Sequence, residues 1–161
     1  MRQAAVDNQF VQMIQQNEGV IYKVVSFYAD KEHPIGDLYQ EVVLNLWKAF
    51  PSFRGESKYS TWIYRIALNT CVSFYRRNKK NVTYVDISFD IPETVENNEQ
   101  IQKLYKLINR LGKIERALVL LYLDDKSYKE IGEITGITVT NVATKLSRIK
   151  EKLKQMSNEQ N

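Results

Sequence analysis

The sequence has few residues of the types that build disulfides, metal centres and membrane spans. Its one cysteine, Cys71, has no partner for an internal disulfide, and its one histidine, His33, excludes a His/Cys metal cluster. No apolar run has the length of a bilayer span, and none near the start has the form of a signal peptide. We therefore expect a soluble, cytoplasmic protein that needs no metal or other cofactor.

Charge of one sign is scarce or missing in several segments. Residues 51–80 carry seven basic side chains and one acidic one, whereas residues 81–102 carry five acidic side chains and no basic one. Residues 103–161 carry twelve basic and seven acidic side chains. Two basic segments that flank an acidic connector indicate a polyanionic partner more strongly than the overall net charge of +4 does.

Apolar residues in the first 80 positions recur with the period of a helix. Pro34 is well placed to begin a helix, because the first turn does not need its N–H, and Pro51 is well placed to stop it. The stretch SFRGESKYS that follows is rich in turn formers. We predict helices over residues 6–28 with a break at 17–19, over 34–50 and over 60–79, with a loop over 52–60.

Residues 81–102 break this period. Apolar and polar residues alternate over 85–91, which is typical of a half-buried strand, but the sequence offers no second strand to pair with it. We interpret the segment as a flexible acidic linker between two small domains of an all-α protein. The predicted organisation is a domain over 1–80, the linker over 81–102, a domain over 103–156 and a disordered tail over 157–161.

Helical periodicity resumes with predicted helices over 101–111 and 116–123, and a further pair follows. Ser127 and Glu130 match the S-x-x-E capping box, Gly136 suits the left-handed residue that ends a helix, and Thr138 can cap the next one. The predicted buried stripe of this last helix is Val139, Val142, Leu146, Ile149 and Leu153.

This pair has the layout of a helix-turn-helix, whose second helix enters the major groove of DNA. The residues left on its outer face are of the types that contact bases and phosphates. The alternative is an ordinary helical hairpin with a solvated polar face. The predicted DNA-binding residues are Thr138, Thr140, Asn141, Thr144, Lys145 and Arg148.

Two blocks of the chain resemble bacterial RNA polymerase sigma factors of the extracytoplasmic-function group. DLYQEVVLNLWKAFPSFRGESKYSTWIYRIALNTCVSFYRR, residues 37–77, resembles their second conserved region, and LINRLGKIERALVLLYLDDKSYKEIGEITGITVTNVATKLSRIKEKL, residues 107–153, resembles their fourth. The resemblance implies a protein that binds core RNA polymerase, directs it to specific promoters and starts their melting. The implied partners are the clamp helices of the largest subunit, the flap of the second-largest subunit, promoter DNA and an anti-sigma protein.

The helix that begins at Pro34 carries a mostly polar stripe opposite its core positions. Such a stripe is usually a solvated face, but the resemblance implies that it docks on the polymerase clamp helices. The predicted polymerase-binding residues are Asp37, Gln40, Glu41, Leu44, Trp47 and Lys48.

Aromatic and basic residues are interleaved between Phe53 and Lys80, a pattern that suits single-stranded DNA. The resemblance implies that this loop and helix capture a non-template base of the minus-ten element. Asn69 is the predicted base reader, while Trp62 and Phe74 fit the core equally well. The predicted minus-ten contacts are Arg54, Lys58, Tyr59, Trp62, Arg65, Asn69, Arg76 and Arg77.

Two other function classes compete with a sigma factor. A stand-alone helix-turn-helix regulator would leave the block over 37–77 unexplained and would need its own dimerisation surface. A small hydrolase or nuclease would need a catalytic set, and the sequence shows no carboxylate pair, Ser/His/Asp set or phosphate-binding glycine loop. We therefore predict that the protein is not an enzyme.

Overall fold

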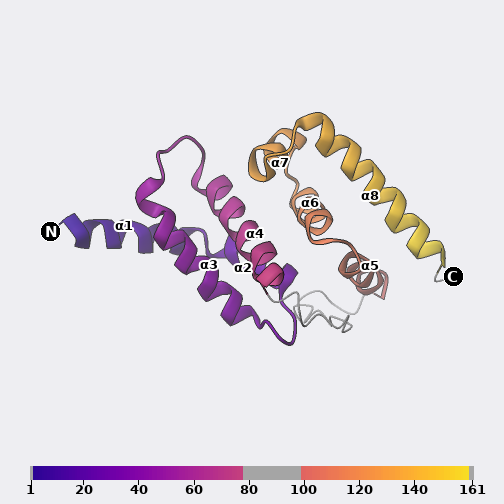
Figure 1. The fold of residues 1–161 in the computed structure, drawn as a ribbon, viewed down its shortest axis with the longest axis horizontal. Helices are drawn as coiled ribbons and strands as arrows, with labels where there is room; N and C mark the ends of the chain where they lie inside the picture. Colours follow the sequence, from indigo (N-terminus) through magenta and orange to yellow (C-terminus); the bar gives the residue numbers. More distant parts are fainter. Residues whose placement is uncertain (1, 78–98, 160–161) are drawn as a thin grey trace. The chain divides into compact units, whose positions relative to one another are not determined.

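The computed structural model describes residues 2–77 and 99–159, and every element that it describes is helical (Figure 1). The chain divides into two compact units, Met1–Tyr84 and Val85–Asn161, which we call unit 1 and unit 2. The predicted all-α class with two helical domains is confirmed. No helix in the described ranges has the length and apolar character that a membrane crossing requires.

Unit 1 begins with two helices that meet where the sequence predicted a break. A single residue separates the helix α1 (Arg2–Gln16) from α2 (Glu18–Tyr28). Asn17 lies between them, and its side-chain amide donates a hydrogen bond of 2.8 Å to the carbonyl of Met13. This bond satisfies one of the carbonyls that a helix leaves open at its end.

The rest of unit 1 follows the two prolines. Pro34 is extended (φ −62°, ψ 156°) and immediately precedes α3 (Ile35–Ala49). Pro51 lies in the short 3-10 turn η1 (Phe50–Ser52), which ends that helix as predicted. The loop that follows leads into α4 (Tyr59–Arg77).

The core of unit 1 lies between α2, α3 and α4, which pack on one another. Each helix contributes fully buried side chains, and each aliphatic one contributes about 1.5–3 kcal/mol relative to exposure. The largest or most central of these residues are Ile21, Val24, Tyr28, Leu38, Val42, Leu46, Ile63, Tyr64, Ala67 and Cys71.

Unit 2 contains α5 (Glu99–Asn109), α6 (Lys113–Leu123), α7 (Tyr128–Thr135) and α8 (Val139–Glu159). The helix α6 is buried at every position from Arg116 to Leu121, because α5, α7 and α8 all pack against it or beside it. It begins earlier than predicted, at Lys113, where the carboxylate of Glu115 accepts a hydrogen bond of 3.1 Å from the N–H of Gly112.

Two predicted boundaries of the C-terminal domain are wrong. The helix α5 begins at Glu99, two residues before the predicted helix start at 101 and four before the predicted domain start at 103, with an acidic residue in its first turn, where the helix dipole favours one. The helix α8 continues through Glu159, so residues 157–159 are not a disordered tail; Met156, only 8% exposed, keeps the last turns packed. The predicted linker over 81–98, including the alternating stretch, lies outside the described residues.

Candidate nucleic-acid interface

The turn between α7 and α8 is built by the residues that the sequence singled out. The N–H of Ser127 donates to the carboxylate of Glu130 at 3.2 Å, and the N–H of Glu130 donates to the Ser127 hydroxyl at 3.1 Å. Gly136 ends α7 in the left-handed conformation with φ 79°. Thr138 then accepts a hydrogen bond of 3.2 Å from the N–H of Asn141 and so caps α8. The capping box, the glycine turn and the second cap are therefore confirmed.

Gly132 is a further requirement of this turn that the sequence analysis missed. A Cβ atom at Gly132 would lie 2.7 Å from the carbonyl oxygen of Ile137, which is closer than real Cβ contacts. The chain after α7 can fold back over this helix only because residue 132 has no side chain. The position of Gly132 inside a short predicted helix could have indicated this close approach. A glycine there destabilises a helix by about 1 kcal/mol relative to alanine, so its presence calls for a packing reason.

We predict that Gly132→Ala lowers the free energy of unfolding of unit 2 by about 1–3 kcal/mol, because the turn must move to admit the methyl group. Gly19→Ala is the matched control: it also lies in a helix, but a Cβ there would meet nothing within 4 Å. Chemical denaturation of both variants measures the effect. Equal stability of the two variants would show that the turn adapts without cost.

The outer face of α8 carries the predicted DNA-binding residues. Thr138, Thr140, Asn141, Thr144, Lys145 and Arg148 are all exposed. Val142, Leu146 and Ile149 are buried as predicted, and Leu153 is half-buried. The predicted burial of Val139 is wrong: it is 50% exposed, because it is the first residue of α8 and lies beside the turn, before the helix meets the core.

Other cations of α8 are used inside unit 2. Lys152 forms an ion pair of 3.2 Å with Glu115, and the Lys150 ammonium lies 4.3 Å from the centre of the Tyr122 ring. A hydrogen bond with Tyr122 raises the pKa of Lys150. These contacts fasten α8 to α6 on one side of the helix. Lys145 and Arg148 lie earlier on the helix and are exposed, so a phosphate or base edge can reach them.

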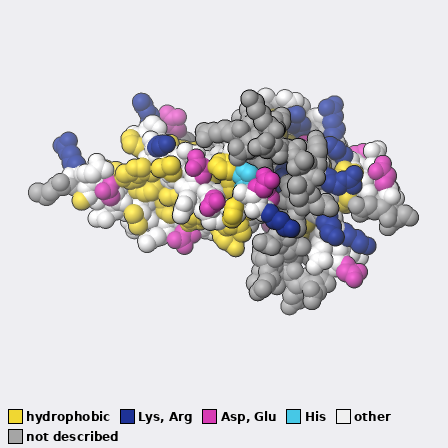
Figure 2. All heavy atoms as spheres, turned by 60° about the horizontal axis from the view of Figure 1, so that its bottom comes forward, with side chains coloured by type: hydrophobic (Ala, Val, Ile, Leu, Met, Phe, Trp, Pro, Cys, Tyr) yellow, Lys and Arg dark blue, Asp and Glu magenta, His cyan; other side chains and the backbone are white. Residues whose placement is uncertain are grey.

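The predicted polymerase-binding residues share one face of α3. Five of them are exposed and Glu41 is half-buried, opposite the buried Leu38, Val42 and Leu46. The face is not uniformly polar, since Leu44 is 44% exposed and Trp47 is 38% exposed. Exposed apolar side chains within a polar stripe are typical of a protein interface. Figure 2 shows hydrophobic side chains gathered on one face of unit 1.

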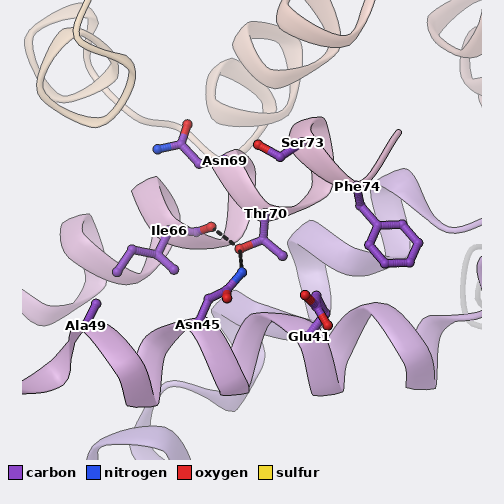
Figure 3. Close-up of a pocket in the computed structure, with 8 residues that line it drawn as sticks. All are labelled: Glu41, Asn45, Ala49, Ile66, Asn69, Thr70, Ser73 and Phe74. Atoms are coloured by element: carbon purple, nitrogen blue, oxygen red, sulfur yellow. Dashed lines mark hydrogen bonds between the residues drawn. The ribbon is translucent and has the colours of Figure 1, made fainter. Parts of the chain in front are cut away.

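A pocket of about 280 Å³ lies between α3 and α4 (Figure 3). Asn69 is exposed at its rim, and Thr70, beside it, is 6% exposed and points toward α3. Five of the eight lining residues are polar, and one of these is a carboxylate. The residues that line this α3–α4 pocket are Glu41, Asn45, Ala49, Ile66, Asn69, Thr70, Ser73 and Phe74.

The loop before α4 is held by a cluster of rings. Phe53 stacks on Tyr59 with ring centres 4.8 Å apart and also lies 4.9 Å from the ring of Trp62. Trp62 is only 9% exposed, which favours the core over stacking on DNA, the two places predicted for it; the ring supports the loop from inside. Phe74 is half-buried and packs edge-on against His33 at 4.8 Å.

Only some of the side chains predicted to contact the minus-ten element lie in the described part of the chain. Arg54, Lys58 and Arg65 are exposed, and Tyr59 is half-buried in the ring cluster. Arg76 and Arg77 belong to α4, but their side chains lie outside the described part of the chain. No group of His, Cys, Asp and Glu in the described ranges is arranged to hold a metal ion.

The sequence predicts no functional role for α1, yet α1 forms one wall of a second hollow. A groove of about 600 Å³ lies between the first turns of α1 and the end of α3 with the following loop. Its position beside the ring cluster depends on tertiary packing, and no local sequence pattern could have indicated it. The residues that line this α1 groove are Gln3, Val6, Gln9, Trp47, Lys48, Phe50, Pro51, Phe53 and Tyr59.

Comparison with known families identifies both units. Residues 13–81 match Sigma-70 region 2, and residues 101–153 match Sigma-70, region 4. The RNA polymerase sigma factor YlaC of Bacillus subtilis (strain 168) is 33% identical over 132 residues, which cover 74% of this chain and 75% of the relative. The ECF RNA polymerase sigma factor SigW of the same organism is 30% identical over 154 residues, which cover 84% and 81%.

Solved structures share the fold. The sigma factor RpoE in complex with the anti-sigma factor NepR from Bartonella quintana gives a TM-score of 0.76 at 20% identity, over 93% of this chain and 97% of that one. CnrH in complex with the cytosolic domain of CnrY gives a TM-score of 0.68 at 16% identity, over 96% and 91%.

The chain belongs to the RNA polymerase sigma factors of the extracytoplasmic-function type, with sigma-70 regions 2 and 4. It is a promoter-specificity subunit that directs RNA polymerase to promoters, and it is not an enzyme. The match over both regions decides against a stand-alone helix-turn-helix regulator, which would not account for region 2.

Proposed function

We propose that three surfaces, two on unit 1 and one on unit 2, carry out separate steps of promoter recognition. The exposed face of α3 docks on the clamp helices of the largest polymerase subunit. Asn69, together with the loop over 52–60, holds the melted minus-ten strand. The outer face of α8 reads the minus-thirty-five element as duplex. We assign the first two tasks to a domain over 1–80 and the third to the domain that begins with α5.

The observation that carries the proposal is the geometry of α8. Five side chains of DNA-contacting types lie exposed on α8, and Thr138, just before it, is exposed as well. The Thr138 cap and the turn over Gly132 fix where this helix starts. Recognition by a helix in the major groove requires that its first turns point at the base edges. Thr140, Asn141 and Thr144 lie in those turns. Lys145 and Arg148 come later on the helix, nearer to the phosphate backbone of the DNA.

Apolar side chains on unit 2 support a contact with the flap of the second-largest subunit. Ile114 is 53% exposed, Leu123 is 48% exposed and Tyr122 is 40% exposed, all on α6. Large apolar side chains that remain exposed on a small domain are typical of an interaction surface. We propose that these exposed apolar side chains, which lie near the two ends of α6, take part in binding the flap.

The two solved relatives also support a regulatory partner. RpoE was solved with the anti-sigma factor NepR, and CnrH was solved with the cytosolic domain of CnrY. We propose that an anti-sigma protein binds this chain as well and competes with polymerase for the exposed face of α3.

The experiment that tests the assignment of α8 compares Lys145→Ala and Arg148→Ala in holoenzyme on a set of single-base promoter variants. Loss of a phosphate contact should weaken binding to all sequences similarly and lower the salt slope by about one. Loss of a base contact should relax specificity at one position, by about 1–3 kcal/mol.

Lys154→Ala is the matched control, because it removes one exposed positive charge farther along the same helix. If Lys145→Ala and Arg148→Ala bind every promoter variant as the control does, the recognition face has been misplaced.

A further inference from the structure

One hydrogen-bonded link joins α3 to α4 at the floor of the α3–α4 pocket (Figure 3). The side-chain amide of Asn45 donates a hydrogen bond of 2.9 Å to the hydroxyl of Thr70. That hydroxyl donates in turn to the carbonyl of Ile66, one turn earlier on α4, at 2.7 Å. The hydroxyl is thus used as acceptor and donor at once, which fixes its rotamer and the direction from which Asn45 approaches.

The position of this link on both helices connects the two surfaces of unit 1. On α3, Asn45 lies one turn from Glu41 and one turn from Lys48, which belong to the polymerase-binding face. On α4, Thr70 is the neighbour of Asn69, and Figure 3 shows their side chains pointing in different directions, Thr70 toward α3 and Asn69 away from it. A shift of α4 along α3 would therefore move Asn69 relative to the polymerase.

Apolar packing alone only weakly holds the position of α4 along α3. The buried residues of α3 are Leu38, Val42 and Leu46, and burial of apolar area has no preferred direction. A hydrogen bond between side chains does have a direction and a length, and polar contacts of this kind set the register of packed helices.

We propose that Asn45 and Thr70 are positioning residues for Asn69: their hydrogen bond sets the register of α4 on α3 and thereby the distance between the base reader and the polymerase-binding face. This inference rests on the proposed role of Asn69. A base-edge contact requires a separation of about 2.7–3.2 Å, so a small displacement of α4 weakens it. Asn45 and Thr70 touch no base themselves.

The test uses full-length holoenzyme with Thr70→Val, which keeps the shape of the side chain and removes the hydroxyl, with Asn45→Ala and with Thr70→Ser. Base discrimination at each minus-ten position is measured on promoters with that region already mismatched. Thr70→Val and Asn45→Ala should lower discrimination about three- to tenfold at the position that Asn69→Ala affects, because a misplaced base contact loses part of its selectivity. Thr70→Ser should restore it, and affinity for core polymerase should stay at the wild-type value.

Ser26→Ala is the matched control for a general loss of packing in unit 1. The Ser26 hydroxyl is buried, with no hydrogen-bond partner among the described residues, so its removal should leave discrimination unchanged. If Thr70→Val and Asn45→Ala lower the melting temperature but keep wild-type discrimination, the link is only structural and the inference is wrong. If Asn69→Ala itself keeps wild-type discrimination, the proposed minus-ten role fails together with this inference. If Thr70→Val does not fold, Asn45→Ala decides, because Asn45 is only half-buried at the pocket wall.

Discussion

Replacing Gln40 with Ala and Glu41 with Lys in the same chain should lower its affinity for core RNA polymerase by about 30-fold or more, since the change reverses a charge inside the proposed interface, and mismatched charges there cost several kcal/mol. Gln40 is exposed and Glu41 is half-buried, and neither belongs to the buried set of α3, which is Leu38, Val42 and Leu46. Helical content should therefore stay at the wild-type level. A titration of labelled core polymerase, with circular dichroism of each variant, measures both quantities.

The matched control is Gln12→Ala with Glu32→Lys, which makes the same two changes at exposed positions of unit 1 outside the α3 face. It should bind core polymerase like the wild type. Core affinity that is equal for the two double variants would remove Gln40 and Glu41 from the interface. Promoter binding is not the readout here, because Glu41 also lines the α3–α4 pocket.

The local signals of the sequence were sufficient for the helix-turn-helix. A capping box, a left-handed glycine and a threonine cap each act within four residues, so they specify α7 and the start of α8 without help from distant parts of the chain. The same is true of the break at Asn17 and of the two prolines around α3. Helix ends set by local hydrogen bonds could therefore be predicted.

The buried face of α4 could not be predicted as well. The helical period places Ile63, Ile66, Thr70 and Phe74 on one apolar face of α4, whereas Ile66 and Phe74 are only half-buried. Their place in the core is taken by Tyr64, Ala67, Leu68 and Cys71. The reason is that α4 packs against both α2 and α3, so its buried face is wider than one stripe and is centred elsewhere. Trp62 falls within this wider face, which explains why it is buried.

Contacts between two distant segments of the chain also could not be predicted from the sequence. The link from Asn45 to Thr70 spans 25 residues, and the α1 groove joins the first turns of the chain to the loop after α3. The approach of Gly132 to Ile137 needed the path of the turn, although the residues are close in sequence. In each case the residue types were visible, but the contact follows from helix packing.

The substitution Asn69→Ala should impair the opening of a duplex promoter while leaving the binding of core polymerase unchanged. The side chain is exposed on α4 beside the α3–α4 pocket, and its amide offers both a donor and an acceptor to a base edge. The cations nearby, Arg65 and those of the loop, are of the types that contact phosphates, and such contacts carry little sequence information. Extrusion of a base from the stack costs a few kcal/mol, and the amide contact offsets part of that cost.

A promoter whose minus-ten region is already mismatched separates the reading of the base from its extrusion. On this template Asn69→Ala should open DNA as the wild type does, but should lose about 5- to 100-fold discrimination at one base, the range expected for a good base-edge contact. Asn69→Asp keeps an acceptor and loses the donor, so it should change which base is preferred instead of abolishing the preference. If Asn69→Ala opens duplex promoters normally and keeps its base preference, Asn69 is only a surface residue of α4. The reader would then lie in the loop over 52–60, where Phe53 and Tyr59 already form a stacked pair.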